Sequence, residues 1–169
     1  TGMIAGTYVF RLTVTNSLAE TATDDITVTI AAGCGGTKKY VTPNSVTGGY
    51  NSYYSTSSGY QPGDTIVLQA SYNPWGYFGF GSVAGTASCP IIVMQEGGQV
   101  TLKDGIAFEN VQYVKVLGNL GGLQYGFKVE SNLADPNNVA IGIAKKSRNV
   151  EVANVYVTNS EYGCWIKNE

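Results

Sequence analysis

Short β-rich runs recur through the second half of this sequence, separated by glycine and asparagine turns. They cover residues 91–95, 100–102, 106–108, 114–117, 127–129, 141–143, 150–152, 155–157 and 164–166. If Gly105, Gly126, Gly142 and Gly163 are equivalent, their separations are 21, 16 and 21 residues. A repeat of about 20 residues built only from short strands cannot be a helical solenoid, but it matches one coil of a β-helix. The sequence therefore predicts an all-β fold, a parallel β-helix.

Alternation within this repeat sorts the side chains, because successive residues of a strand point to opposite sides. The first predicted inward column is Ile106, Phe127, Ile143 and Cys164, and the second is Phe108, Val129 and Ile166. Each coil of a solenoid is stable only when its neighbours cover it. We therefore expect an elongated core in which these residues stack on one another.

The first thirty residues follow a different pattern. Residues 7–14 and 25–30 both alternate, with a polar turn between them, which predicts a β-hairpin. Two strands alone are marginally stable in water. The composition changes after the glycine-rich break at 31–36, so we expect one unit at residues 1–32 and a second at 33–169.

Residues 6–16 and 22–30 resemble the closing F and G strands of PKD domains. The resemblance implies that 1–32 is the truncated end of an immunoglobulin-like sandwich whose earlier strands are absent here. It also implies that the hairpin pairs with the remainder of a parent chain or with a partner strand.

Two later elements, Tyr-Val-Thr-Pro at 40–43 and Pro-Gly-Asp-Thr-Ile-Val-Leu at 62–68, resemble the opening coil of secreted right-handed parallel β-helix proteins of the pectate-lyase-like kind. The stretch 85–100 is similar to an early coil of β-helices that are joined to PKD modules and exported by type IX secretion. The resemblance implies that 33–169 holds the N-terminal cap and first coils of such a solenoid, truncated at its C-terminal end. A location outside the cell, secreted or on the outer surface, follows from it.

Charge and composition narrow the possible partners. The net charge is −2 and the ten basic residues are scattered, which disfavours nucleic-acid binding. No apolar run reaches the roughly 18 residues of a membrane-spanning helix. The sequence has no histidine and no CxxC pair, so we expect no metal centre and no cofactor. Calcium would need clustered acids, whereas Glu109, Glu130 and Glu151 are isolated in the sequence.

Three cysteines leave two alternatives open. Cys34 and Cys89 lie beside turn residues and are the candidates for a disulfide, whereas Cys164 lies inside a strand pattern and would then be a buried thiol. The alternative is three free thiols.

The columns expected to face outward are Ala107, Lys128, Ala144 and Trp165, and beside them Glu109, Glu130, Lys146 and Lys167. Sugars commonly bind to an aromatic plane flanked by charged or amide groups. Trp165, Lys128, Lys167 and Glu130 are therefore the candidate binding residues, as a saccharide-facing strip. The alternative is an ordinary solvated exterior on which charges alternate because the strand does.

An enzymatic role is the second hypothesis. β-Helix polysaccharide lyases use a basic residue or a tyrosine as the base, and Lys128, Lys146, Arg148 and Lys167 are available. Glycosidases need paired carboxylates, but the adjacent acids Asp24 and Asp25 belong to the hairpin. No complete active site is recognised, so no catalytic residue is assigned.

Aromatic residues concentrate ahead of the repeats, and we expect them to cover the first end of the solenoid rather than to bind glycans. They are Tyr50, Tyr53, Tyr54, Tyr60, Tyr72, Trp75, Tyr77, Phe78 and Phe80.

The leading prediction is a fragment of a multidomain β-helix protein with a binding, adhesive or structural role toward polysaccharide. The alternative is the N-terminal part of a polysaccharide-degrading enzyme. We also expect the last coil to be paired by further coils or by a partner strand.

Overall fold

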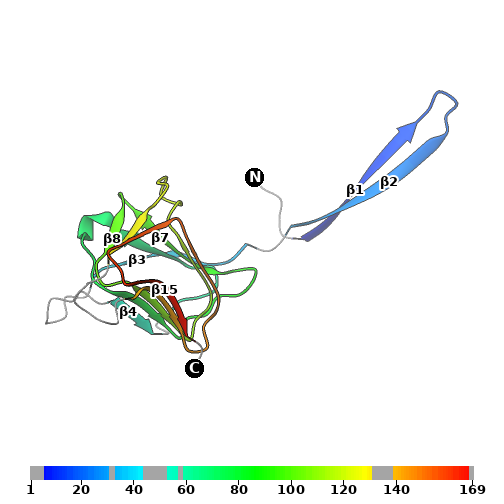
Figure 1. The fold of residues 1–169 in the computed structure, drawn as a ribbon. Coiled ribbons are helices and arrows are strands. Elements are labelled where there is room, and N and C mark those ends of the chain that lie inside the picture. Colours follow the sequence, from blue (N-terminus) through cyan, green and yellow to red (C-terminus); the bar gives the residue numbers. More distant parts are fainter. Residues whose placement is uncertain (1–5, 31–32, 44–52, 57–58, 131–138, 168–169) are drawn as a thin grey trace. The chain divides into compact units, whose positions relative to one another are not determined.

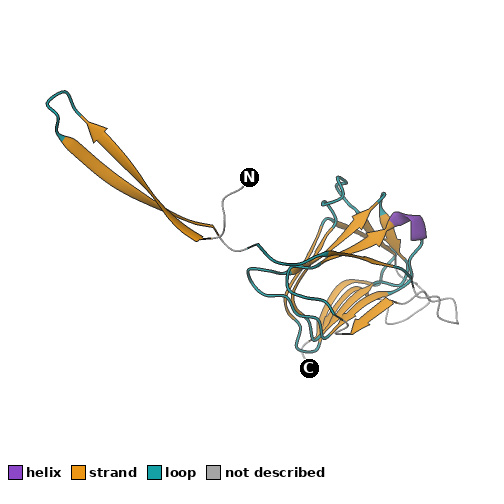
Figure 2. Ribbon diagram, turned by 180° about the vertical axis from the view of Figure 1, so that it is seen from behind, coloured by secondary structure: helices purple, strands orange, loops and turns teal. Residues whose placement is uncertain are grey.

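The computed structural model describes residues 6–30, 33–43, 53–56, 59–130 and 139–167. Contacts within the chain separate two compact units, Thr1–Cys34 and Gly35–Glu169. The regular structure in the described residues is strand, apart from one 3-10 turn, η1 (Ala70–Tyr72) (Figure 2).

The first unit is the predicted hairpin. Strand β1 (Gly6–Thr15) pairs antiparallel with β2 (Thr21–Ile30), from Gly6 opposite Ile30 to Thr15 opposite Thr21. Asn16 closes the turn, because its side-chain oxygen accepts hydrogen bonds from the backbone N–H groups of Leu18 and Glu20 at 2.9 and 3.0 Å. Sequence alternation therefore identified this element correctly.

The second unit is a parallel β-solenoid, as expected. Its strands are β3 (Lys38–Val41), β4 (Tyr53–Thr56), β5 (Thr65–Gln69), β6 (Phe78–Gly81), β7 (Ile91–Glu96), β8 (Val100–Leu102), β9 (Ile106–Glu109), β10 (Gln112–Leu117), β11 (Phe127–Glu130), β12 (Val139–Ala144), β13 (Arg148–Ala153), β14 (Val155–Thr158) and β15 (Tyr162–Lys167). They form three parallel sheets in the orders β13-β10-β7-β5-β3, β14-β11-β8 and β15-β12-β9-β6-β4. The two opening elements of the sequence resemblance also pair, since β3 runs parallel to β5.

Consecutive strands belong to different sheets. In the described residues β3 to β6 alternate between the two five-stranded sheets, and from β7 onward the chain visits all three sheets in each coil. Strands β7, β8 and β9 form one coil, β10, β11 and β12 the next, and β13, β14 and β15 the one after (Figure 1). From β6 onward each strand therefore pairs with the strand three places later in the chain, whereas β3, β4 and β5 each pair with the strand two places later. That pairing satisfies the backbone groups and stacks equivalent side chains.

The predicted repeat of about 20 residues is wrong, because it counted steps from one sheet to another as whole coils. Ile106 pairs with Ile141 and Ile141 with Cys164, steps of 35 and 23 residues. On the neighbouring sheet Val100 pairs with Phe127 and Phe127 with Val155, steps of 27 and 28 residues. Loops of different length join the strands, so the coil has no fixed length in sequence.

The predicted core columns are therefore only partly correct. Ile106 and Cys164 do share a column, but Ile141 lies between them; Ile143 belongs to the column of Phe108 and Ile166. Phe127 and Val129 face inward from a different sheet, in β11. The individual strands were predicted well, whereas their assignment to sheets was not.

The interior packs closely. Its largest completely buried side chains are Trp75, Phe78, Phe80, Phe108 and Phe127. The Phe80 and Phe108 rings stack with centroids 5.8 Å apart and an interplanar angle of 10°. Of the aromatic residues expected to cover the first end, Trp75, Phe78 and Phe80 are instead part of the core; Tyr50 and the side chains of Tyr53 and Tyr54 lie outside the described residues.

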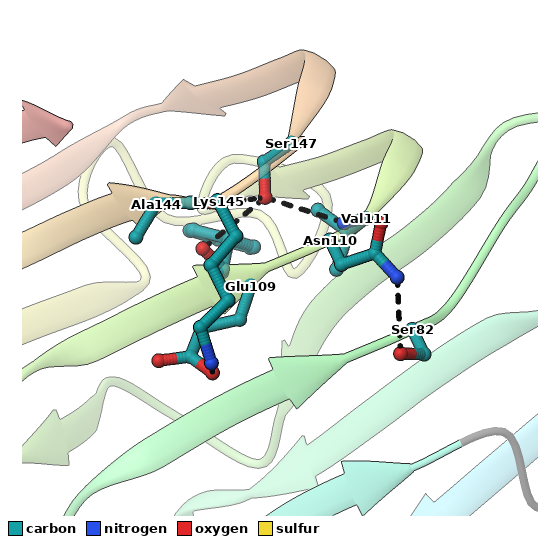
Figure 3. Close-up of polar contacts among 8 residues, drawn as sticks. Ser82, Glu109, Asn110, Val111, Ala144, Lys145 and Ser147 are labelled. Atoms are coloured by element: carbon teal, nitrogen blue, oxygen red, sulfur yellow. Dashed lines mark hydrogen bonds and ion pairs between the residues drawn. The ribbon is translucent and has the colours of Figure 1, made fainter. Parts of the chain in front are cut away.

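One corner of the coil repeats its backbone conformation from turn to turn (Figure 3). Ser82, Asn110 and Lys145 follow β6, β9 and β12, and all three have positive φ, at 56°, 53° and 55°. The Asn110 side chain donates to Ser82 Oγ at 3.2 Å, and Ser147 Oγ accepts from the Val111 N–H at 3.2 Å. Polar side chains thus join successive coils where the strands end.

The first end of the solenoid is held by a buried acid. Asp64 accepts hydrogen bonds from the backbone N–H groups of Thr37 and Gln61, both at 2.8 Å, and forms an ion pair with Lys39 at 2.8 Å. Burial raises the pKa of Asp64, but Lys39 and the two N–H groups outweigh it and hold the pKa at about 2. Gly36 is required here, because a Cβ atom on it would lie 2.0 Å from the carbonyl carbon of Gly63.

The cysteines are in two states. Cys34 and Cys89 are disulfide-bonded, and Cys164 is free. The pairing of Cys34 with Cys89 stays a prediction. Cys164 is exposed rather than buried as expected, because β15 is the last strand of its sheet among the described residues and no strand there stacks on it.

Candidate functional site

The outward face of the sheet β14-β11-β8 combines exposed rings with a charged cluster. Parallel pairing places Thr101, Lys128 and Tyr156 in one row across the three strands. On β11 the residues directly before and after Lys128, Phe127 and Val129, are buried in the core. Because alternate residues of a strand point to opposite sides, this row faces away from the core.

Two tyrosine rings lie together on this face. The centroids of Tyr125 and Tyr156 are 6.3 Å apart, with the rings tilted by 49°. The exposed fractions of the two residues are 44% and 49%. Paired rings that remain in solvent offer an apolar surface with a hydroxyl on each ring.

The position of Tyr125 is set by the preceding coil. Gln99 Nε2 donates to the carbonyl oxygen of Tyr125 at 2.7 Å. Asn73 in turn donates to the carbonyl oxygen of Gln99 at 2.7 Å and accepts from the N–H of Thr101 at 2.9 Å. The side-chain amides of Gln99 and Asn73 therefore fix the position of the backbone at Tyr125.

The charged cluster lies on β11 and at Lys103, directly after β8. Glu130 forms ion pairs with Lys103 through one carboxylate oxygen and with Lys128 through the other. Hydrogen bonds from Lys103, and next from Lys128, lower the pKa of Glu130 against the opposing effect of burial. Only 14% of the Glu130 side chain is exposed, so the carboxylate is a fixed anion between two ammonium groups.

The four residues expected to form one strip lie on two sheets. Lys128 and Glu130 are on β11, as just described, whereas Trp165 and Lys167 are on β15. On β15 the Lys167 ammonium lies over the Trp165 ring, 5.8 Å from its centroid, and 49% of Trp165 is exposed. Trp165 shares its row with Gly142 and Ala107, so the tryptophan stands beside small residues.

Sequence reasoning missed three members of the face. Tyr125, Tyr156 and Lys103 were not singled out, although Tyr156 lies between two inward valines and is therefore outward by simple alternation. The error followed from the assumed repeat, which placed β11 and β15 in one sheet and left β14 without neighbours. A predicted repeat of three strands per coil would have placed Tyr156 opposite Lys128, as the structure does.

Other residues proposed in the sequence analysis lie elsewhere. Glu109 on β9 forms an ion pair with Lys145 at 2.5 Å, and Lys146 lies in the turn before β13. Lys115 on β10 pairs with Glu151 on β13 at 2.7 Å, and Arg148 donates to Gln112 at 2.7 Å. The two ion pairs and the hydrogen bond of Arg148 join neighbouring coils.

Two classes of feature are absent from the part of the chain that the structure describes. It holds no group of three or more His, Cys, Asp or Glu side chains placed to bind a metal ion. It also contains no helix whose length and apolar character would allow it to cross a bilayer.

Comparisons with protein-family models, with curated proteins and with solved structures found no match to this chain.

Proposed function

We propose that the solenoid is a saccharide-binding module with an adhesive or structural role, and that the Tyr125–Tyr156 face is its contact surface. The observation that carries the proposal is the pair of exposed rings beside the Lys103–Glu130–Lys128 cluster on one sheet. A sugar ring presents C–H groups on its faces and hydroxyls around its edge. The tyrosine rings can pack against the C–H faces of the sugar, and the ammonium and carboxylate groups can form hydrogen bonds with its hydroxyls.

The rigidity of the sheet supports this assignment. Lys128 and Tyr156 lie opposite each other in adjacent strands, so their spacing is set by backbone pairing and not by loop conformation. A binding surface that is ordered before the ligand arrives loses less conformational entropy on binding. This matters for a polysaccharide, whose individual contacts are weak.

We further propose that the protein acts outside the cell, secreted or on the outer surface. The disulfide-bonded state of Cys34 and Cys89 supports this, because such bonds persist mainly in oxidising compartments. The resemblances of 1–32 to PKD strands and of the solenoid to proteins exported by type IX secretion lead to the same location. In that setting the first unit would act as a spacer.

A glycan array followed by calorimetry tests the proposal. We expect the chain to bind at least one polysaccharide, and the double variant Tyr125→Ala/Tyr156→Ala to bind it about tenfold or more weakly, since losing an aromatic contact costs about 1–2 kcal/mol. Tyr40→Ala is the control, because Tyr40 is also an exposed tyrosine but lies on β3 of another sheet.

The proposal fails if no glycan binds, or if the control weakens binding as much as the double variant does. Release of shortened saccharides in the same assay would instead assign the chain to polysaccharide degradation. Circular dichroism of each variant checks that the solenoid remains folded.

A further inference from the structure

Gln95 is a polar side chain in the interior of the solenoid. It faces inward from β7 in the same row as Leu68, and it is completely buried. Within the ranges that the structure describes, the buried polar or charged residues are Asp64 and Gln95. Asp64 holds the first end of the solenoid through Lys39 and two backbone N–H groups. The amide of Gln95 lies in a later coil and contacts a loop.

This loop joins β10 to β11 and comprises residues 118–126. Gln95 Nε2 donates to the carbonyl oxygen of Gly118 at 2.8 Å, where the loop begins. A Cβ atom added to Gly121 would lie 2.6 Å from Nε2, and one added to Gly126 would lie 1.9 Å from it. The amide therefore lies close to the backbone at the start, the middle and the end of the loop.

The outer side of the loop gives it little apolar burial. Leu120, Leu123 and Tyr125 are all exposed. A segment whose large side chains remain in water must be ordered by other contacts. The hydrogen bond from Gln95 is such a contact, and it is made inside the core. Because Gly126 follows Tyr125 directly in the sequence, the buried amide lies beside the residue next to the exposed ring.

The amide contributes more to the shape of this loop than to stability. Gln95 Oε1 accepts no hydrogen bond from the described residues. A buried acceptor without a donor is destabilising, which offsets the gain from the bond to Gly118. Exchanging the two amide atoms would place Oε1 against the carbonyl oxygen of Gly118, so the orientation of the amide is fixed. An apolar side chain of similar length would fill the interior about as well but would lose the bond to the loop.

We propose that Gln95 is a positioning residue of the Tyr125–Tyr156 face. From the interior it fixes the course of residues 118–126, and so the place at which the Tyr125 ring meets Tyr156. Gln99 holds the carbonyl oxygen of Tyr125, and Gln95 holds the loop that leads to it. Both glutamines belong to the preceding coil, so that coil sets the position of the ring. The inference rests on the saccharide-binding role proposed above for this face.

Two variants, Gln95→Met and Gly121→Ala, test the contact from both sides. Methionine keeps the length of the side chain but removes the amide. At Gly121 the atoms nearest to an added Cβ all belong to Gln95, so alanine there strains the same contact. We expect each variant to lower the NMR order parameters of residues 118–126 from about 0.85 to below about 0.6. Each should also weaken polysaccharide binding about tenfold, while the melting temperature stays within about 4 °C of wild type.

Leu68→Met is the matched control, because it places a methionine in the same interior row but removes no hydrogen bond to the loop. It should change neither the order parameters of the loop nor the binding of polysaccharide. Unchanged order parameters in both test variants would overturn the proposal, and so would a loosened loop with unchanged binding.

A large fall in melting temperature, with the loop no more mobile than the strands, would show that Gln95 is a purely structural residue, and would overturn the proposal as well. If the wild-type chain binds no polysaccharide, the saccharide role fails. The order parameters need no ligand, so they still decide whether Gln95 positions Tyr125.

Discussion

The hairpin and the solenoid contain strands of similar sequence character, but only the solenoid buries its apolar side chains. On the hairpin, Phe10, Leu12 and Val14 lie on one face and are all more than half exposed. Ile26 and Val28 face the same side from β2. In the solenoid, residues of the same types, such as Ile66, Leu68 and Phe108, are completely buried.

The difference shows what strand pairing alone supplies. Both regions satisfy the backbone hydrogen bonds between their strands, but two strands have no second layer to cover an apolar face. A solenoid gains that cover from its own coil, since the three sheets face a shared interior. Hydrogen bonding between strands therefore forms the sheet, whereas burial of the apolar side chains requires the stacked coils.

The prediction with the largest expected effect compares a phenylalanine substitution in the solenoid with one on the hairpin. Phe108→Ala should lower the free energy of unfolding of the solenoid by about 3–5 kcal/mol, because it leaves a cavity beside Phe80. Phe10→Ala on the hairpin should change it by less than about 0.5 kcal/mol, since the ring is exposed. Urea denaturation of both variants measures this. Similar losses would show that the hairpin face is covered in solution.

The second test concerns the first end of the solenoid. Asp64→Asn removes the ion pair with Lys39 and one backbone acceptor, and should destabilise the solenoid at neutral pH. The Asp64 pKa is lowered from 3.8 to about 2, so its contribution of about 2 kcal/mol is complete above pH 4 and is lost as pH falls toward 2. Unfolding of wild type and variant from pH 2 to 7 should therefore converge at the acid end. A constant difference across that range would remove Asp64 as the titrating group.

The smallest expected effect is on the hairpin surface. Arg11 donates to both carboxylate oxygens of Asp25, at 2.7 and 2.8 Å, and this lowers the pKa of Asp25. Both side chains are exposed, and exposed ion pairs contribute little to stability. Arg11→Gln should leave the melting temperature of the solenoid unchanged in a thermal scan. A clear decrease would show that the two units unfold together.

Local signals in the sequence carried the prediction of strands and turns. The alternation in residues 7–14 and 25–30 identified the hairpin, and the short apolar runs after residue 91 identified strands of a parallel solenoid. These patterns depend on neighbours along the chain, which a sequence displays directly. The predicted strip has a different outcome, because the assumed repeat placed Trp165 and Lys128 in one sheet. Lys128 lies in the sheet β14-β11-β8, whereas Trp165 lies in the sheet β15-β12-β9-β6-β4.

The sequence by itself determined that this chain forms strands, alternates its side chains and winds in parallel coils. Only the tertiary structure decided which strands share a sheet, and so which side chains meet. Gln95 shows why: it is completely buried, and its amide donates to the carbonyl oxygen of Gly118 at 2.8 Å, a contact between coils. Register between coils depends on loop lengths that vary along the chain, so residues distant in sequence become neighbours only once the coils are stacked.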